Sequence, residues 1–162
     1  VAERFDVALR IGPVKDTALV VRAIDAVGGA VVASPEYIAR RGTPAGPAEL
    51  AAHDCLVFTT PPFGSTWTLS HTDGRVAEVE VRGRLAANSL AVLRRAARAG
   101  LGVARLPDYL YVDDCGAGRL VRLLPGWSTG VRKVMVAYPQ ARRLAPAVRL
   151  FIDFAAARLA RP

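Results

Sequence analysis

The sequence of 162 residues is poor in the side chains that build covalent, metallic and redox sites. It contains 2 cysteines, 2 histidines and 1 methionine. Two cysteines are too few for a disulfide framework. His53, Cys55, His71 and Cys115 lack the C-x-x-C or H-x-x-x-H spacing of a metal site. We therefore expect no metal, no cofactor and a reducing compartment, the cytoplasm.

Long apolar runs and the common catalytic motifs are also missing. No stretch is long enough to cross a membrane, and no stretch resembles a signal peptide. The patterns G-x-S-x-G, H-E-x-x-H and the P-loop do not occur. The carboxylates form no pair by spacing, and both histidines fall in an expected loop or turn, where surface positions are more usual than catalytic ones. The sequence predicts no catalytic residue.

Basic residues outnumber acidic ones, and the 22 Lys and Arg against 14 Asp and Glu give a net charge of +8. Such a balance is typical of nucleic-acid binding. The arginines are scattered, however, and no aromatic-rich stretch alternates with them. We favour arginines spread over solvated faces, with nucleic-acid binding as the alternative.

The hydrophobic content of 52% and the mean hydropathy of +0.25 predict a sizeable core. The length fits one domain or two small lobes. The chain has no initiator methionine and starts almost inside a predicted strand, so we expect a fragment.

Strands and helices alternate along the chain, which indicates the α/β class with mostly parallel pairing. The predicted strands cover residues 5–12, 19–24, 30–33, 55–60, 67–69, 76–85, 100–107, 120–124 and 133–138. The predicted helices cover residues 35–41, 89–99 and 107–115 and a segment that begins at residue 146.

Two of these helices follow a strand and begin at a residue that can cap them. Ser34 can cap the first, with Pro35 at its first position, and Asn88 can cap the second, which begins at Ser89. Ligands of open α/β sheets bind where strand ends meet helix starts, and the free N–H groups there suit a carboxylate. The two helix starts are therefore candidate ligand contacts.

An ordered set of motifs covers essentially the whole chain. The motifs are DVALRIG, ASPEYIARRGTP, HDCLVF, WTL, VRGRLAANSLAVLRRAARAGLGVARLPDYL, AGRLVRLLPGW, KVMVAYP and LAPAVRLFIDF. Their order closely resembles the effector-binding domain of LysR-type transcriptional regulators.

The resemblance implies an α/β fold like that of type 2 periplasmic binding proteins, in which two α/β lobes are joined by two crossing strands around a small effector. The first lobe maps to residues 1–32 and 136–162, and the second to residues 33–135. The crossings fall near residues 32–34 and 135–137. The family's opening strand and helix, which carry part of the effector site, are absent here, so the first lobe is incomplete.

The resemblance implies that this chain is part of a bacterial transcription factor, and not an enzyme, and that it senses a small-molecule effector, for which a carboxylate is the candidate. DNA would be bound only through the family's N-terminal winged helix-turn-helix, which this chain lacks. The alternative is a solute-binding protein or an enzyme on the same fold. The candidate effector-binding residues are Arg10, Ser34, Pro35, Thr59, Asn88, Ser89, Val103 and Leu106.

The predicted helix at residues 89–99 has an apolar arc of about half its circumference, wider than the ~100° stripe of a single core contact. The outer part of the arc is formed by Val92, Ala96 and Ala99. In the family, effector domains pair head to tail through this helix and the strand before it, here residues 78–85, which implies a dimer of the full-length protein. The alternative is that alanine serves there only as a helix former.

Overall fold

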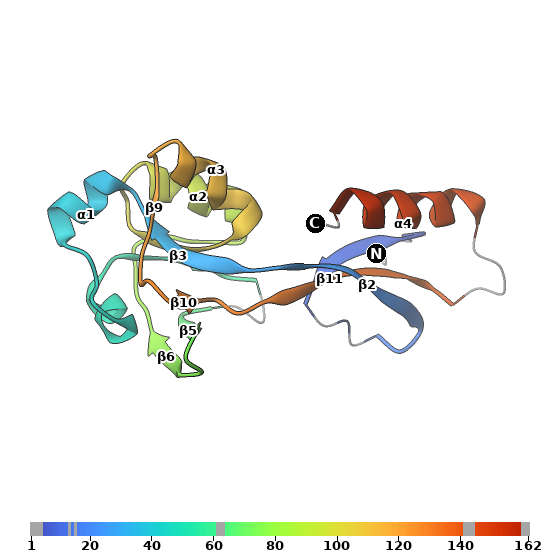
Figure 1. Cartoon of the computed structure of the whole chain (residues 1–162), viewed down its shortest axis with the longest axis horizontal. Helices are drawn as coiled ribbons and strands as arrows, with labels where there is room; N and C mark the ends of the chain where they lie inside the picture. The colour runs from blue at the N-terminus through green and yellow to red at the C-terminus, as the bar shows by residue number, and fades with distance from the viewer. Residues whose placement is uncertain (1–4, 13, 15, 61–63, 141–144, 160–162) are drawn as a thin grey trace. The chain divides into compact units, whose positions relative to one another are not determined.

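The computed structural model describes residues 5–12, 14, 16–60, 64–140 and 145–159. The chain forms two compact units (Figure 1). Unit 1 comprises Val1–Val27 and Val131–Pro162, and unit 2 comprises Gly28–Gly130. The chain thus passes between the units twice, at residues 27–28 and 130–131. The lobe boundaries expected at 32–33 and 135–136 remain predictions.

Unit 1 is built on an antiparallel sheet of three strands in the order β1-β11-β2. The strands are β1 (Ala8–Ile11), β11 (Arg132–Pro139) and β2 (Leu19–Val27). Helix α4 (Pro146–Leu159) contacts β2 and buries Ile152 and Ala155. These two positions lie three residues apart, so they share the face of the helix that forms the core.

Unit 2 contains a sheet of five strands. In spatial order they are β7 (Ala86–Ala87), β4 (Cys55–Phe58), β8 (Val103–Pro107), β3 (Gly29–Ala33) and β9 (Val121–Arg122). Strand β4 runs parallel to β7 and β8, whereas β3 runs antiparallel to β8 and β9. The expectation of mostly parallel pairing is wrong: of the strand pairs in the described part of the chain, only β4–β7 and β4–β8 are parallel.

Strand β3 is buried along its whole length, as its small and β-branched residues predict. Val31 and Ala33 belong to one core cluster, and Ala30 and Val32 belong to the other, because alternate side chains of a strand point to opposite faces. The central sheet of unit 2 therefore separates two cores.

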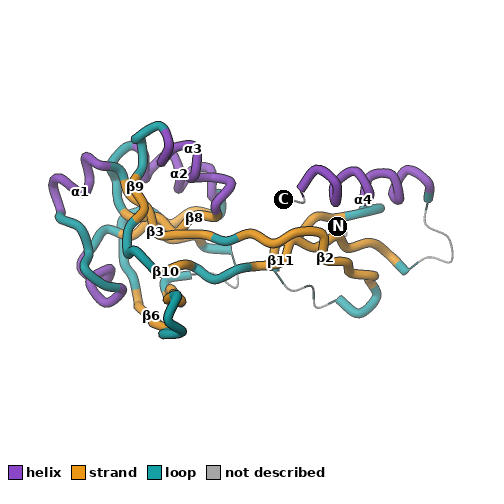
Figure 2. Tube along the Cα trace, viewed as in Figure 1, coloured by secondary structure: helices purple, strands orange, loops and turns teal. Residues whose placement is uncertain are grey.

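One core lies under two helices, α2 (Leu90–Arg98) and α3 (Asp108–Gly116), which cover one face of the sheet (Figure 2). The other core lies under α1 (Pro35–Arg41), the 3₁₀ helix η1 (Pro47–Ala52) and a second, antiparallel sheet. The strands of that sheet are β10 (Trp127–Ser128), β5 (Thr66–His71) and β6 (Val76–Glu80), in that order.

The helix starts differ in how they are capped. The Ser34 hydroxyl accepts a hydrogen bond of 3.1 Å from the Tyr37 N–H, as predicted. The predicted cap of α2 is wrong by one residue: Ser89, and not Asn88, is the capping position, and the Ser89 side chain makes no capping hydrogen bond. The backbone of Ser89 is extended, as it is at Ser34 and as is usual for a cap residue, so the missing hydrogen bond reflects the orientation of the Ser89 side chain.

The strand predicted at residues 76–85 ends at Glu80. Beyond Glu80 the chain leaves β5 and runs beside β4, where the Cys55 N–H donates to the Arg82 carbonyl over 2.8 Å. A Cβ on Gly83 would lie 1.7 Å from the Cys55 carbonyl oxygen, so only glycine allows this approach. The two-residue strands β7 and β10 have no periodic signal in the sequence, and sequence reasoning missed them.

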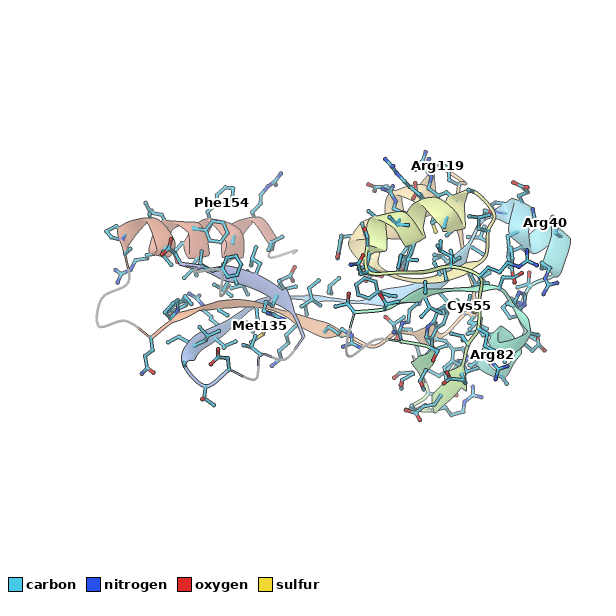
Figure 3. The ribbon with its side chains drawn as sticks, turned by 180° about the vertical axis from the view of Figure 1, so that it is seen from behind. Arg40, Cys55, Arg82, Arg119, Met135 and Phe154 are labelled. Carbon is cyan, nitrogen blue, oxygen red and sulfur yellow. The ribbon has the colours of Figure 1, made fainter. Side chains whose placement is uncertain are left out.

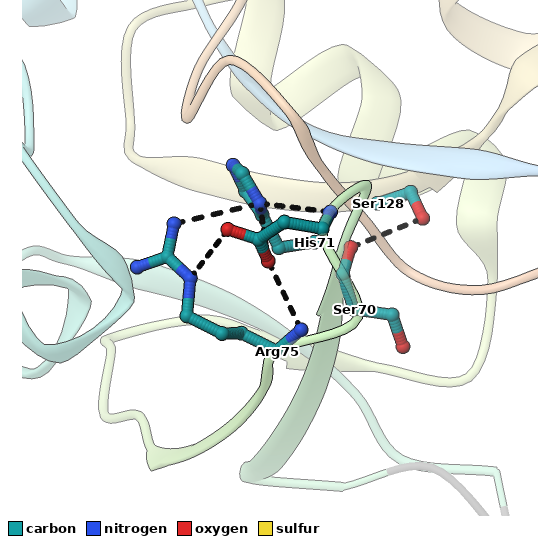
Figure 4. Close-up of polar contacts among 5 residues, drawn as sticks. Ser70, His71, Arg75 and Ser128 are labelled. Atoms are coloured by element: carbon teal, nitrogen blue, oxygen red, sulfur yellow. Dashed lines mark hydrogen bonds and ion pairs between the residues drawn. The ribbon is translucent and has the colours of Figure 1, made fainter.

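The turn between β5 and β6 confirms the hairpin predicted from its Asp-Gly pair. The Asp73 carboxylate accepts from the backbone N–H and the Nε of Arg75 and contacts His71 Nδ1 over 2.8 Å (Figure 4). The backbone N–H of Arg75 is the main cause that lowers the pKa of Asp73 to about 2. Gly74 has a φ of 92°, which favours glycine at the turn.

Candidate functional site

The parallel strands of unit 2 end together at one edge of the sheet. Thr59 follows β4, Asn88 and Ser89 follow β7, and Asp108 follows β8. Gly28 also lies at this edge, because β3 runs the opposite way and Gly29 pairs with Pro107. We call these five residues, Gly28, Thr59, Asn88, Ser89 and Asp108, the C-terminal edge. Such an edge is where α/β sheets bind their ligands.

Backbone hydrogen bonds hold the C-terminal edge together. The Thr59 N–H donates to the Ala87 carbonyl over 3.0 Å, which places Thr59 beside Asn88. The Asp108 N–H donates to the Gly28 carbonyl over 3.1 Å. The structure therefore brings together three of the predicted site residues, Thr59, Asn88 and Ser89.

Helix α2 starts at this edge with backbone donors that its own cap residue does not engage. Its nine residues begin at Leu90, and the Ser89 side chain accepts no hydrogen bond from the first turn. Thr59 and Asn88 are exposed and add a hydroxyl and an amide beside these N–H groups. A carboxylate is the group that such donors and the positive end of a helix favour.

The structure does not bring Ser34 and Pro35 to the C-terminal edge. Strand β3 runs antiparallel to β8, so its far end, and α1 after it, lie at the opposite edge of the sheet. Ser34 is 3% exposed, and its hydroxyl already caps α1. The expectation of two helix starts at one ligand site depended on mostly parallel pairing, which the structure lacks.

The other predicted residues are also separated. Val103 and Leu106 both lie in β8 but belong to opposite cores, and their exposures of 0% and 1% leave them inside the fold. Leu106 shares its core with Phe58, Ala87 and Leu90, which surround the C-terminal edge. Arg10 is an exposed residue of β1 in unit 1, opposite Met135.

Asp108 is a residue of the C-terminal edge that sequence reasoning left out of the site. Its Oδ1 accepts a hydrogen bond of 2.7 Å from the Tyr111 hydroxyl, and a Cβ on Gly28 would lie 2.5 Å from its Oδ2. Burial, together with the hydrogen bond to Asp108, raises the pKa of Tyr111 to about 12. The available signal was an acidic residue directly after a predicted strand.

His53 and Cys55 lie at the start of β4, at the other end of that strand from the C-terminal edge. The Tyr37 hydroxyl bonds His53 Nδ1 over 3.1 Å and accepts from the Asp54 N–H over 2.9 Å, which fixes the start of β4. Burial lowers the pKa of His53 and raises that of Cys55 to about 12. No group of three or more His, Cys, Asp or Glu side chains suited to a metal ion occurs among the residues that the structure describes.

Within the described ranges, no helix is both long enough and apolar enough to cross a membrane.

Comparison with known proteins identifies the family. The family model described as the LysR substrate binding domain matches residues 1–160. The HTH-type transcriptional regulator PtxR of Pseudomonas aeruginosa is 36% identical over 153 residues, which are 94% of this chain and 49% of PtxR. CrgA of Neisseria meningitidis serogroup C, also an HTH-type transcriptional regulator, is 32% identical over 155 residues. The chain thus spans about half the length of these curated relatives.

Solved structures agree with this result. The regulatory domain of AphB from Vibrio vulnificus has a TM-score of 0.80 and 37% identity, over 95% of this chain and 75% of that one. The regulatory domain of CrgA from Neisseria meningitidis has a TM-score of 0.83 and 33% identity, over 96% and 76%. The predicted α/β, periplasmic-binding-protein-like fold of type 2 is confirmed. The chain belongs to the family of LysR substrate-binding domains.

Proposed function

We propose that this chain is the part of a transcriptional regulator that senses a small-molecule effector, and that it catalyses no reaction. The family match over residues 1–160 carries this proposal. The C-terminal edge supports it, because helix N–H groups, a hydroxyl, an amide and the Asp108 carboxylate gather there as hydrogen-bonding groups for a small ligand.

The proposed effector is a small carboxylate that also carries a hydrogen-bond donor. The first turn of α2, with Thr59 and Asn88, supplies donors for the carboxylate. The Asp108 carboxylate beside Gly28 offers acceptor positions for a hydroxyl, amide or ammonium group. An effector contact from Arg10 remains a prediction, and Ser34, Pro35 and Val103 are proposed to support the fold alone.

The partners of the whole protein are proposed from its relatives. PtxR and CrgA are described as HTH-type regulators, so DNA would be bound by a domain outside this chain, in the cytoplasm. A dimer through α2 also remains a proposal. Ala96 is 6% exposed inside the core of unit 2, which leaves Val92, at 45%, and Ala99 for a partner surface.

A thermal-shift screen with small mono- and dicarboxylic acids, some bearing hydroxyl or amino groups, tests the effector site. A ligand that binds only the native state raises the melting temperature. The shift produced by an active acid should disappear in Asn88→Ala and persist in Thr72→Ala, which removes an exposed polar side chain from the hairpin turn. An equal shift in both variants would place the site elsewhere.

A further inference from the structure

A buried carboxylate organises arginines on the outer layer of unit 2. Asp114 of α3 has a side chain with 0% exposure. Its Oδ2 accepts from Arg94 Nε and its Oδ1 from Arg119 Nε, both over 2.7 Å, and Arg98 Nε lies 3.8 Å from Oδ1. One carboxylate thus gathers guanidinium groups from α2 and from the turn after α3.

The geometry of these contacts leaves donors for a ligand. All three arginines face Asp114 with Nε, and each guanidinium carries two further nitrogens, Nη1 and Nη2, with four N–H groups. The side chains of Arg94, Arg98 and Arg119 are 32%, 39% and 45% exposed. Figure 3 shows Arg119 at the outer surface of unit 2.

A hollow of about 430 Å³ lies against this cluster, lined by Arg95, Arg98, Ala99 and Arg119. Within the part of the chain that the structure describes, Arg95 has no carboxylate within 4.0 Å. Asp113 and Asp114 are the carboxylates that act on Arg94. The residues that line the hollow carry three guanidinium groups and no carboxylate, and Asp114 beside them supplies one negative charge, so the hollow carries net positive charge.

We propose that this hollow binds a small phosphorylated molecule with at least two negative charges. One guanidinium group can donate two parallel hydrogen bonds to the oxygens of a phosphate. Three guanidinium groups around one hollow therefore suit a ligand with more than one negative charge. Ligand at this site would bridge α2 and the turn after α3 and so stabilise unit 2.

This site is separate from the proposed effector site. The hollow contacts the last turn of α2, whereas the C-terminal edge contacts its first turn. At 1.5 Å per residue, the nine residues of α2 separate the two ends by about 14 Å. The failure of either proposal therefore leaves the other unaffected.

Arginines in the last turn of a helix also offset the negative end of its dipole without any ligand. If this were the only role of Arg95, its substitution would change the stability of the chain and leave its affinity for anions unchanged. A direct binding measurement separates the two roles.

Calorimetric titration of the chain with inorganic pyrophosphate at low ionic strength is the test, with citrate titrated in parallel. Arg95→Gln should weaken pyrophosphate binding about tenfold, because a charge-assisted hydrogen bond is lost. Arg149→Gln, an exposed arginine of α4 in unit 1, removes the same charge and should weaken binding less than about twofold.

Equal weakening by both variants would overturn the proposal, because attraction to net charge alone would then explain the binding. Citrate binding that is tighter than pyrophosphate binding, and that Arg95→Gln weakens while Asn88→Ala does not, would overturn the phosphate class. If duplex DNA binds in a way that depends on Arg95 and pyrophosphate does not bind at all, the hollow is part of a nucleic-acid surface and the proposal of a small ligand is wrong.

Discussion

Asp114 illustrates how single polar residues fix the structure of unit 2. Burial raises the pKa of its carboxyl, but the hydrogen bonds from Arg94 and Arg119 outweigh burial, and the pKa lies below its ordinary value of 3.8. The ionised form is therefore the one that the fold stabilises. The Asp114 carbonyl also accepts from the N–H groups of Arg119 and Leu120, so this residue holds the turn that leads into β9.

Asp114→Asn should lower the free energy of unfolding by about 2–3 kcal/mol at neutral pH. The effect is smaller than that of a fully buried ion pair, because the arginine partners are partly exposed and solvent screens them. A group with a lowered native pKa stabilises above its unfolded pKa, near 4, and loses that contribution as the pH falls through the native pKa. The difference between wild type and variant should therefore shrink below about pH 4.

Denaturant unfolding at several pH values measures this difference. Asp113→Asn is the matched control, because the neighbouring carboxylate is exposed and makes no ion pair with a described residue within 4.0 Å. A variant as stable as wild type at neutral pH, or a difference that grows on acidification, would contradict this role of Asp114.

At the scale of elements, the parallel strands of unit 2 depend on a close backbone approach at the start of β4. A Cβ on Gly102 would lie 2.0 Å from the Asp54 carbonyl oxygen, a contact that only backbone movement could relieve. The Val103 N–H donates to the same carbonyl over 2.9 Å, so such movement would also break the pairing of β8 with β4.

Gly102→Ala should therefore destabilise the chain by about 2 kcal/mol or more, as overpacking of a core does. Gly116→Ala is the control, because a Cβ there meets no atom within 4 Å in a helical position. That control should leave stability unchanged or raise it by up to about 1 kcal/mol. Equal midpoints of thermal unfolding for the two variants would show that the close approach carries no energetic weight.

The elements also show how far sequence reasoning reaches. Ser34 and Gly42 fix α1 by local capping, and the Asp-Gly pair fixes the β5–β6 hairpin, so both were predictable. The direction of β3 was not, because strand pairing depends on residues distant in the sequence. That one error put Ser34 and Pro35 in the same expected site as Thr59 and Asn88, although they lie at opposite edges of the sheet.

At the scale of the whole molecule, the ordered motifs identified the family, because a shared fold constrains many positions at once, each only weakly. The same motifs did not locate the effector contacts. Val103 is buried in the core. An apolar sequence pattern predicts that a residue is buried, but it does not show whether that residue lines a ligand site or packs inside the fold. Asp108 is the opposite case. The sequence marks it only as an acidic residue in the first turn of a helix, yet it lies at the candidate site.

The proposed effector is a small carboxylate that binds at the C-terminal edge of unit 2. Backbone amide NMR of the labelled chain, titrated with the acid that raises the melting temperature most, tests this binding directly. We expect the largest shift changes at Thr59 and at residues 89–92, the start of α2, and we expect Asn88→Ala to abolish them. Changes concentrated at residues 34–37, at the opposite edge of the sheet, with the start of α2 unmoved, would contradict it.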